Sequence, residues 1–132
     1  MKAISGRPVK ALQIGSTVKC ADNSGAKIMQ IISVKNYKGV WRTRPPAGVA
    51  DWVNCKVLSG TEKVRHQVHK CIVIRQKKEY RRPDGRRVSF EDNAVVLINE
   101  KGEPMGTLIK GPMAKEAAER FPVVAKIASM VI

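Results

Sequence analysis

The stretch CIVIRQKKEYRRPDGRRVSFEDNAVVLI, residues 71–98, joins two apolar runs through a long and highly charged turn. The apolar runs, 71–74 and 94–98, are rich in β-branched residues and have the length of strands. Between them, Pro83 presets φ for a turn, Asp84 can hydrogen-bond its own backbone, and Gly85 is free to take a positive φ. The stretch therefore predicts two strands of a sheet with a β-hairpin, residues 75–87, protruding between them.

Seven cationic side chains crowd the predicted hairpin, and only Glu79 and Asp84 offset them. The seven are Arg75, Lys77, Lys78, Arg81, Arg82, Arg86 and Arg87. Like charges on the two arms of a hairpin lie side by side and repel, so a dense polyanion is needed to offset the cost. Nucleic acid is the obvious polyanion, and we predict that these side chains contact mostly phosphate groups.

The charge of the whole chain supports this interpretation. The formal net charge is +14 on 132 residues, above the magnitude of about 2–8 that suits a small soluble domain. Residues 1–90 carry 20 basic and 5 acidic side chains, whereas residues 91–132 carry 5 basic and 6 acidic ones. We therefore expect the first part to bind nucleic acid, with an affinity that falls steeply with salt, and the tail to face something else.

Most of the chain has the period-two pattern of β-strands. Segments 18–21, 26–34, 53–58, 71–74 and 94–98 are apolar and bounded by turn residues, and 88–90 is the return arm of the hairpin. Short strands at such intervals suggest a small antiparallel barrel, which leaves no open sheet edge. We predict a mainly β fold in one domain of 132 residues, with the barrel over about residues 10–110.

The tail, from about residue 112 to residue 132, is predicted to be helical. Gly111-Pro112 indicates the start of a helix that continues to Arg120, and Phe121-Pro122 indicates the start of a second. In the second segment one helical face would carry Val124, Ile127, Ala128 and Val131.

Two loops have compositions that suit RNA. The loop 37–46 interleaves aromatic and cationic residues, and its candidate RNA-binding side chains are Lys38, Trp41, Arg42 and Arg44. The loop 22–27 offers Asn23, Ser24 and Lys27 to phosphate oxygens. An ordinary solvated loop and a plain turn, respectively, would have the same compositions, and both alternatives stay open.

The three cysteines, Cys20, Cys55 and Cys71, are widely spaced in apolar contexts, which is typical of buried thiols in a reducing compartment. The longest uncharged run, 11–18, is too short and too polar for a signal peptide or a membrane span. We therefore expect a cytoplasmic protein with no membrane partner.

Catalytic and cofactor chemistry has no support in the sequence. His66, His69 and Cys71 resemble a metal cluster, but His66 and Cys71 would point to opposite faces of one strand, and no fourth ligand is nearby. The acidic residues are scattered, and no glycine-rich nucleotide-binding loop is present. We expect no enzyme activity, no cofactor, no metal and no small-molecule substrate.

Three motifs occur in an order typical of one family. They are Asp22-Asn23-Ser24-Gly25-Ala26-Lys27, the hairpin region from Cys71 through Asp84-Gly85 and Phe90 to Leu97, and Gly106-Thr107-Leu108-Ile109-Lys110-Gly111-Pro112. Together they resemble the universal large-subunit ribosomal protein fourteen family, and the segments 1–9 and 41–44 resemble its archaeal and eukaryotic branch. Two positions depart from the pattern, since Cys71 stands where Gly or Ala is usual and Ala50 where Gly is usual.

The resemblance implies a five-stranded barrel with two short C-terminal helices, bound to large-subunit rRNA on the face that meets the small subunit. It also implies contacts with neighbouring large-subunit proteins, bridges to small-subunit rRNA, and binding of initiation factor six, an anti-association factor, by the C-terminal region. The tail residues available for a protein partner are Met113, Lys115, Glu116 and Phe121, with Ala117 and Ile127. Alternatively, most of these apolar side chains simply cover the barrel.

Two readings from other classes remain. A free-standing oligonucleotide-binding barrel or translation factor usually stacks single-stranded RNA on a platform of rings, but the six aromatic residues here are dispersed. A basic protein-interaction adaptor would form complexes with weak salt dependence, which the charge argues against. Recognition of folded RNA through its backbone and shape is better supported.

Overall fold

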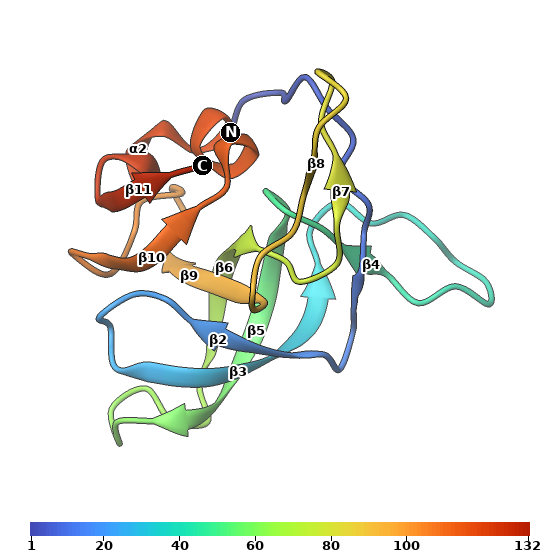
Figure 1. Cartoon of the computed structure of the whole chain (residues 1–132). Coiled ribbons are helices and arrows are strands. Elements are labelled where there is room, and N and C mark those ends of the chain that lie inside the picture. The colour runs from blue at the N-terminus through green and yellow to red at the C-terminus, as the bar shows by residue number, and fades with distance from the viewer.

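The computed structural model, which describes residues 1–132, has a closed β-barrel at its centre (Figure 1). Its strands, in barrel order, are β2 (Thr17–Cys20), β3 (Ala26–Val34), β5 (Trp52–Gly60), β6 (Val68–Arg75) and β9 (Ala94–Ile98). Four seams are antiparallel, and the seam between β2 and β9 that closes the barrel is parallel. The prediction of a mainly β fold with a five-stranded barrel is confirmed, and the parallel seam is the feature that the sequence pattern did not indicate.

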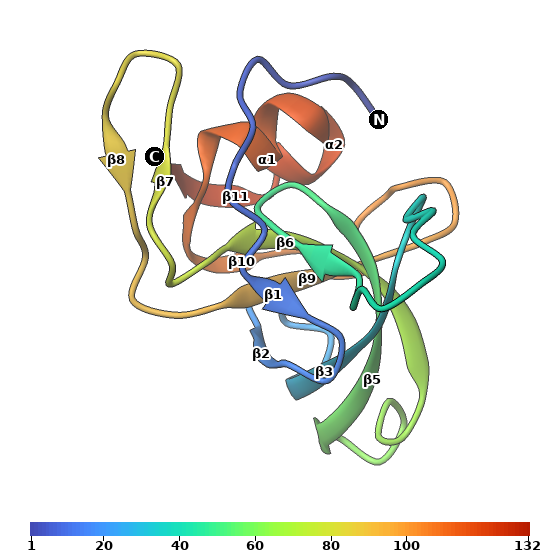
Figure 2. The same cartoon turned by 90° about the vertical axis from the view of Figure 1, so that its right-hand side faces the viewer.

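Three further strand pairs and two helices are attached to the barrel (Figures 1 and 2). β1 (Leu12–Gln13) pairs with β4 (Pro46–Ala47), β7 (Tyr80–Arg81) pairs with β8 (Arg87–Val88), and β10 (Ile109–Met113) pairs in parallel with β11 (Ala128–Val131). The helices are α1 (Lys115–Arg120) and α2 (Pro122–Ala125), and neither is long and apolar enough to cross a membrane. The β7–β8 hairpin and the loop between β3 and β4 stand out from the barrel as separate projections.

Alternate residues of β6 and β9 point into two different cores. On β6, Cys71 and Val73 pack inside the barrel, whereas Ile72 and Ile74 point outward into a core shared with α1, α2 and β10. Every residue of β9 is buried. Both faces of these strands are therefore covered, which explains why their sequences are continuous apolar runs instead of alternating ones.

The C-terminal segment differs from the helical prediction. Gly111 and Pro112 belong to β10, the first helix begins at Lys115, and the second ends at Ala125. The prediction of two short C-terminal helices is confirmed, but the expectation that the second continues through residue 131 is wrong, because the last residues pair with β10 as the parallel strand β11. The Lys115 and Ile132 backbones close this pairing, with Lys115 N–H donating to Ile132 O and Ile132 N–H donating to Met113 O, both at 2.8 Å. Over so short a segment, apolar residues spaced three and four apart do not distinguish a helix from a strand. The strand forms because β10 offers an unpaired edge beside it.

The predicted hairpin is confirmed, and its turn has the expected chemistry. Tyr80 is registered with Val88, and Arg81 with Arg87. Gly85 takes a φ of 90°, its N–H donates to Arg82 O at 2.9 Å, and Asp84 Oδ1 accepts from the Arg86 N–H at 3.0 Å. The short ladder leaves the arms largely free of other strands, so the side chains on the hairpin face outward unless a specific partner holds them.

Ala50 lies in a backbone conformation that favours glycine. Its φ is 69°, and it is fully buried beside β6, where its N–H donates to Val73 O at 2.8 Å. A glycine, which is usual at this position in the family that the sequence resembles, adopts the same angle without strain.

The three cysteines are free thiols. Cys55 and Cys71 are buried inside the barrel, and the half-buried Cys20 donates to Asp22 Oδ1 at 3.0 Å. Burial, followed by the charge of Asp22, raises the pKa of Cys20 to about 12. The pKa of Cys71 is raised well above its ordinary value by hydrogen bonding to Cys55 and by burial. Because a protonated thiol is a poor nucleophile and a poor metal ligand, Cys20 and Cys71 are unsuited to either role, and Cys55 and Cys71 pack as apolar side chains in the barrel core.

Candidate nucleic-acid interface

Five of the seven predicted hairpin cations are exposed: Lys77, Lys78, Arg81, Arg86 and Arg87. Two of them have acidic neighbours on the hairpin itself, Arg87 with Glu79 at 3.0 Å and Arg86 with Asp84 at 3.8 Å. All four of these side chains are at least half exposed, so the pairs are screened by water and weak. The hairpin therefore keeps a surplus of positive charge on its surface.

One pair of cations is held face to face by the register of the hairpin. Arg81 lies directly opposite Arg87 in the β7–β8 ladder. Like charges opposite one another destabilise a strand pair. Arg87 is partly neutralised by Glu79, so Arg81 is the member of the pair that has no carboxylate within 4.0 Å.

Arg75 is buried, and its assignment as an RNA contact is wrong. Its side chain is 9% exposed, and Nε lies 2.9 Å from Asp92 Oδ1. Nη1 donates to the backbone oxygens of Lys110 at 2.9 Å and Pro112 at 2.8 Å. Between these two oxygens lies Gly111, where a Cβ would come within 2.8 Å of the guanidinium. Arg75 therefore joins the end of β6 to β10, and its charge is used inside the fold.

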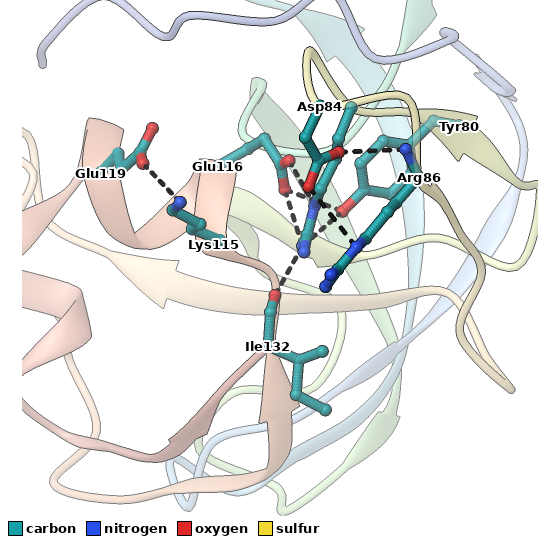
Figure 3. Close-up of polar contacts among 8 residues, drawn as sticks. Tyr80, Asp84, Arg86, Lys115, Glu116, Glu119 and Ile132 are labelled. Atoms are coloured by element: carbon teal, nitrogen blue, oxygen red, sulfur yellow. Dashed lines mark hydrogen bonds and ion pairs between the residues drawn. The ribbon is translucent and has the colours of Figure 1, made fainter.

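Arg82 is likewise turned inward, where it ties the hairpin to the C-terminal elements. Figure 3 shows its partners Glu116 and Ile132 beside Tyr80. Its Nε lies 2.9 Å from Glu116 Oε1, and its Nη2 donates to the backbone oxygen of Ile132 at 2.6 Å. The Tyr80 hydroxyl donates to Glu116 Oε2 at 2.8 Å. The prediction that Arg82 contacts RNA is therefore corrected, because its guanidinium is held inside the protein.

The same network shifts the pKa values of Tyr80 and Arg82. Burial and the hydrogen bond to Glu116 raise the pKa of Tyr80. Burial alone would lower the pKa of Arg82, but hydrogen bonds to Glu116 and Tyr80 raise it above its ordinary value. At neutral pH Tyr80 is therefore a neutral phenol and Arg82 a cation.

The loop between β3 and β4 presents its cations without internal partners. Lys38, Arg42 and Arg44 are exposed, and none lies within 4.0 Å of a carboxylate. Trp41 is also exposed, and its contact with RNA stays a prediction. The loop thus adds positive charge in a projection separate from the hairpin (Figures 1 and 2).

The loop 22–27 is largely occupied by its own fold. The Asn23 side chain accepts from the Thr107 N–H at 2.9 Å and donates to the Thr107 hydroxyl at 2.8 Å. Ser24 donates its N–H and its hydroxyl to the carboxylate of Asp22. Asp22, which the sequence reasoning did not single out, is buried and also accepts from the Leu97 N–H at 2.9 Å. Of the three predicted contacts in this loop, Lys27 is the one whose side chain has no partner in the chain.

The predicted partner residues of the tail are mostly buried. Met113, Ala117 and Phe121 pack on the outside of the barrel, so the alternative that they cover it applies to them. Glu116 is 6% exposed, and the expectation that it is free for a partner is wrong. Lys115 remains exposed. The apolar side chains that the tail does expose were not predicted: Val123, Met130, Val131 and Ile132.

The histidines do not converge on a metal site. His66 lies in an exposed turn with a φ of 61°, whereas Cys71 points into the barrel. No group of three His, Cys, Asp or Glu side chains is arranged so that it could hold a metal ion.

Comparison with known proteins identifies one family for this chain. A family model described as Ribosomal protein L14p/L23e matches residues 11–132. The chain belongs to this family. The family resemblance inferred from the three sequence motifs is thus confirmed, and the L14p/L23e chain is a structural, non-enzymatic protein of the large ribosomal subunit.

Its relatives include three archaeal proteins, each described as large ribosomal subunit protein uL14. Identity is 48% to the protein of Methanocorpusculum labreanum, 49% to that of Methanoregula boonei and 50% to that of Thermoplasma volcanium. Each match spans 132 residues and covers 100% of both chains. These relatives agree with the expected branch of the family.

Proposed function

We propose that this ribosomal protein binds large-subunit rRNA directly through the exposed cations of its hairpin and of the β3–β4 loop. The observation that carries the proposal is the surplus of exposed cations on the hairpin, above all Arg81, which lies opposite Arg87 in the ladder and has no carboxylate within 4.0 Å. The hairpin is long, solvated and anchored at both ends, by Arg75 at its base and by Arg82 near its tip. A rigid cationic projection suits folded RNA, because phosphate contacts position a protein without reading sequence.

The proposed RNA footprint follows the exposed residues. It consists of Lys27, Lys38, Trp41, Arg42, Arg44, Lys77, Lys78, Arg81, Arg86 and Arg87. Asn23 and Ser24 contribute mainly by holding the loop that presents Lys27.

The salt dependence of rRNA binding tests this footprint. In the double variant Arg81→Gln/Arg86→Gln, the slope of log affinity against log salt should fall by about 1–2, because two phosphate contacts are lost. The matched control, Lys101→Gln/Lys126→Gln, removes the same charge from exposed positions outside the footprint and should leave the slope unchanged. Equal slopes for both variants and the wild type would show that the hairpin faces something other than RNA.

The location of the chain in the ribosome is the second part of the proposal. We place it at the subunit interface of cytoplasmic ribosomes, in contact with neighbouring large-subunit proteins and with small-subunit rRNA across intersubunit bridges. Ultraviolet crosslinking in lysate after sedimentation tests this, with the crosslinked RNA sequenced. Crosslinks from residues 20–90 to large-subunit rRNA in the subunit peak are expected. A protein found mainly on heterogeneous RNA at the top of the gradient would instead indicate a free-standing module.

We also propose that the exposed apolar side chains of the tail, with Lys115, receive a protein partner, initiation factor six. Met130 is 56% exposed and Ile132 is 47% exposed, and both belong to the near-neutral part of the chain. Depletion of charge around apolar side chains is typical of the centre of a protein interface. Val123→Ser/Met130→Ser should weaken binding of purified initiation factor six and leave rRNA binding intact. Unchanged binding of the factor would exclude this surface.

A further inference from the structure

Trp41 is exposed to a degree that its surroundings do not explain. It is 83% exposed and its neighbour Val40 is 85% exposed, more than any other large apolar side chain of the protein. The other tryptophan, Trp52, is only 9% exposed and packs edge-on against Phe121, with ring centroids 6.2 Å apart. The protein thus buries one indole thoroughly and leaves the other in water, at a cost that an external contact would remove.

The base of the loop that carries Trp41 is fixed to the barrel. Lys35 Nζ lies 3.5 Å from the centre of the Trp52 ring, and the Lys35 N–H donates to Trp52 O at 2.9 Å. The cation and the hydrogen bond hold the loop where β3 ends. The direction in which the loop leaves the barrel is therefore defined (Figures 1 and 2).

The tip of the loop is a shaped turn. Arg42 takes a φ of 53°, and the Thr43 hydroxyl donates to the backbone oxygen of Trp41 at 3.0 Å. The Tyr37 ring lies against Gly39 and leaves no room for a Cβ there. Such local contacts reduce the conformational freedom of the loop and present the indole outward before any partner arrives.

The charge around the indole is of one sign. Residues 23–50 contain no Asp or Glu, but they contain Lys27, Lys35, Lys38, Arg42 and Arg44. Five cations with no carboxylate among them favour a strongly anionic partner for this loop. A lone indole among such cations fits a polyanion that offers a flat apolar face, which is an unstacked base between two phosphates.

We propose that Trp41 stacks on an unpaired nucleotide of large-subunit rRNA, while Lys38 and Arg42 hold the flanking phosphates. The inference rests on the proposed rRNA-binding function and deepens it, since it assigns a base contact where the other contacts are to phosphate. A fully paired helix is excluded as the ligand of this ring, because its bases offer no free face.

The test compares variants in their binding to purified large-subunit rRNA of the source organism over a range of salt concentrations. Trp41→Ala should lower affinity by about 10- to 100-fold, as expected for one base–aromatic stack, with no change in salt slope because no phosphate contact is lost. Trp41→Phe should retain most of the affinity. Arg42→Gln should reduce the slope by about one. Val68→Ala is the control for loss of an exposed apolar side chain elsewhere.

The outcomes separate this inference from the proposed function. In addition to the affinities, ultraviolet irradiation of the wild-type complex should crosslink the peptide containing Trp41 to a nucleotide outside any helix. If Trp41→Ala binds like the wild type and both show steep salt dependence, the stacking inference is wrong and the rRNA-binding function stands. If Trp41→Ala binds naked rRNA normally but is lost from assembled subunits, the ring faces a protein, and the inference is again wrong. If the wild type shows no salt-dependent binding, the proposed function itself fails.

Discussion

Replacing Arg75 by methionine is expected to destabilise the fold by about 3 kcal/mol without removing an RNA contact. The magnitude follows from the groups that lose their partner. The backbone oxygens of Lys110 and Pro112 each lose a charged donor, at about 1 kcal/mol apiece. Asp92 loses its cation at 2.9 Å, which adds about 1 kcal/mol because this carboxylate is 25% exposed and water partly replaces the cation. Methionine preserves most of the buried aliphatic stem, so little is added for lost packing.

Urea denaturation measures this effect, with Lys77→Met as the matched control. For a urea dependence of about 2 kcal/mol per molar, the midpoint of Arg75→Met should fall by about 1.5 M at unchanged slope. Lys77 lies two residues further along the chain and is exposed. Lys77→Met should therefore change the free energy of unfolding by less than about 0.5 kcal/mol and leave the urea midpoint close to that of the wild type. Its rRNA-binding salt slope should instead drop by about one. If Arg75→Met has the urea midpoint of the wild type but a smaller salt slope of rRNA binding, the reasoning is refuted, because Arg75 would then face RNA.

Three further changes probe the inner side of the hairpin and the tail. Glu116→Gln should lower the free energy of unfolding by about 2 kcal/mol, whereas Glu119→Gln, in the same helix but exposed, should change it by less than about 0.5 kcal/mol; equal urea midpoints would contradict the buried network. Gly111→Ala should cost about 2 kcal/mol, because φ is 80° and the new Cβ would lie 2.8 Å from a buried guanidinium nitrogen, and a wild-type melting temperature would show that the strand relaxes freely. As the pH rises from about 9 toward 12, stability should fall, because the unfolded chain releases protons there while the raised pKa values of Cys20 and Tyr80 keep both groups protonated in the fold; thermal melts at pH 8 and pH 10.5 that coincide would argue against this linkage.

The barrel strands could be predicted from the sequence because two signals agree in them. β3 and β9 were expected at residues 26–34 and 94–98, and both occupy those residues. Each is an apolar, β-branched run that ends at turn residues, and tertiary packing reinforces this local preference. The parallel seam between β2 and β9 has no such local signal, since it joins strands more than seventy residues apart.

The tail shows where local pattern stops being informative. Residues 128–131 have apolar spacing that suits a short helix, but they form β11 because β10 offers an unpaired edge beside them. That edge is created by the fold and cannot be read from the segment itself. The exposure of Val131, which the helical interpretation placed on one face with Val124 and Ile127, follows from the same strand.

The hairpin arginines show the corresponding limit for charge. Sequence composition counts the cations but does not say which of them point inward. Arg75 follows four residues that are buried on both faces of β6, and burial simply continues to it. That continuity is the one signal in the sequence that could have flagged it. Arg82 has no comparable signal, because its partners Glu116 and Ile132 lie more than thirty residues further along the chain.

These internal pairs also change the meaning of the charge division between the two parts of the chain. The acidic groups that neutralise Arg75 and Arg82 are Asp92 and Glu116, and both belong to the near-neutral last third. Part of the division is therefore internal complementarity between the hairpin and the elements that anchor it. The remaining cations of the hairpin have no carboxylate partner outside the hairpin itself. Arg75 and Arg82 anchor the hairpin and therefore fix these cations in place before RNA binds. Because ordering a flexible basic loop on RNA would cost conformational entropy, an anchored hairpin should bind more tightly than the same charges on a free segment.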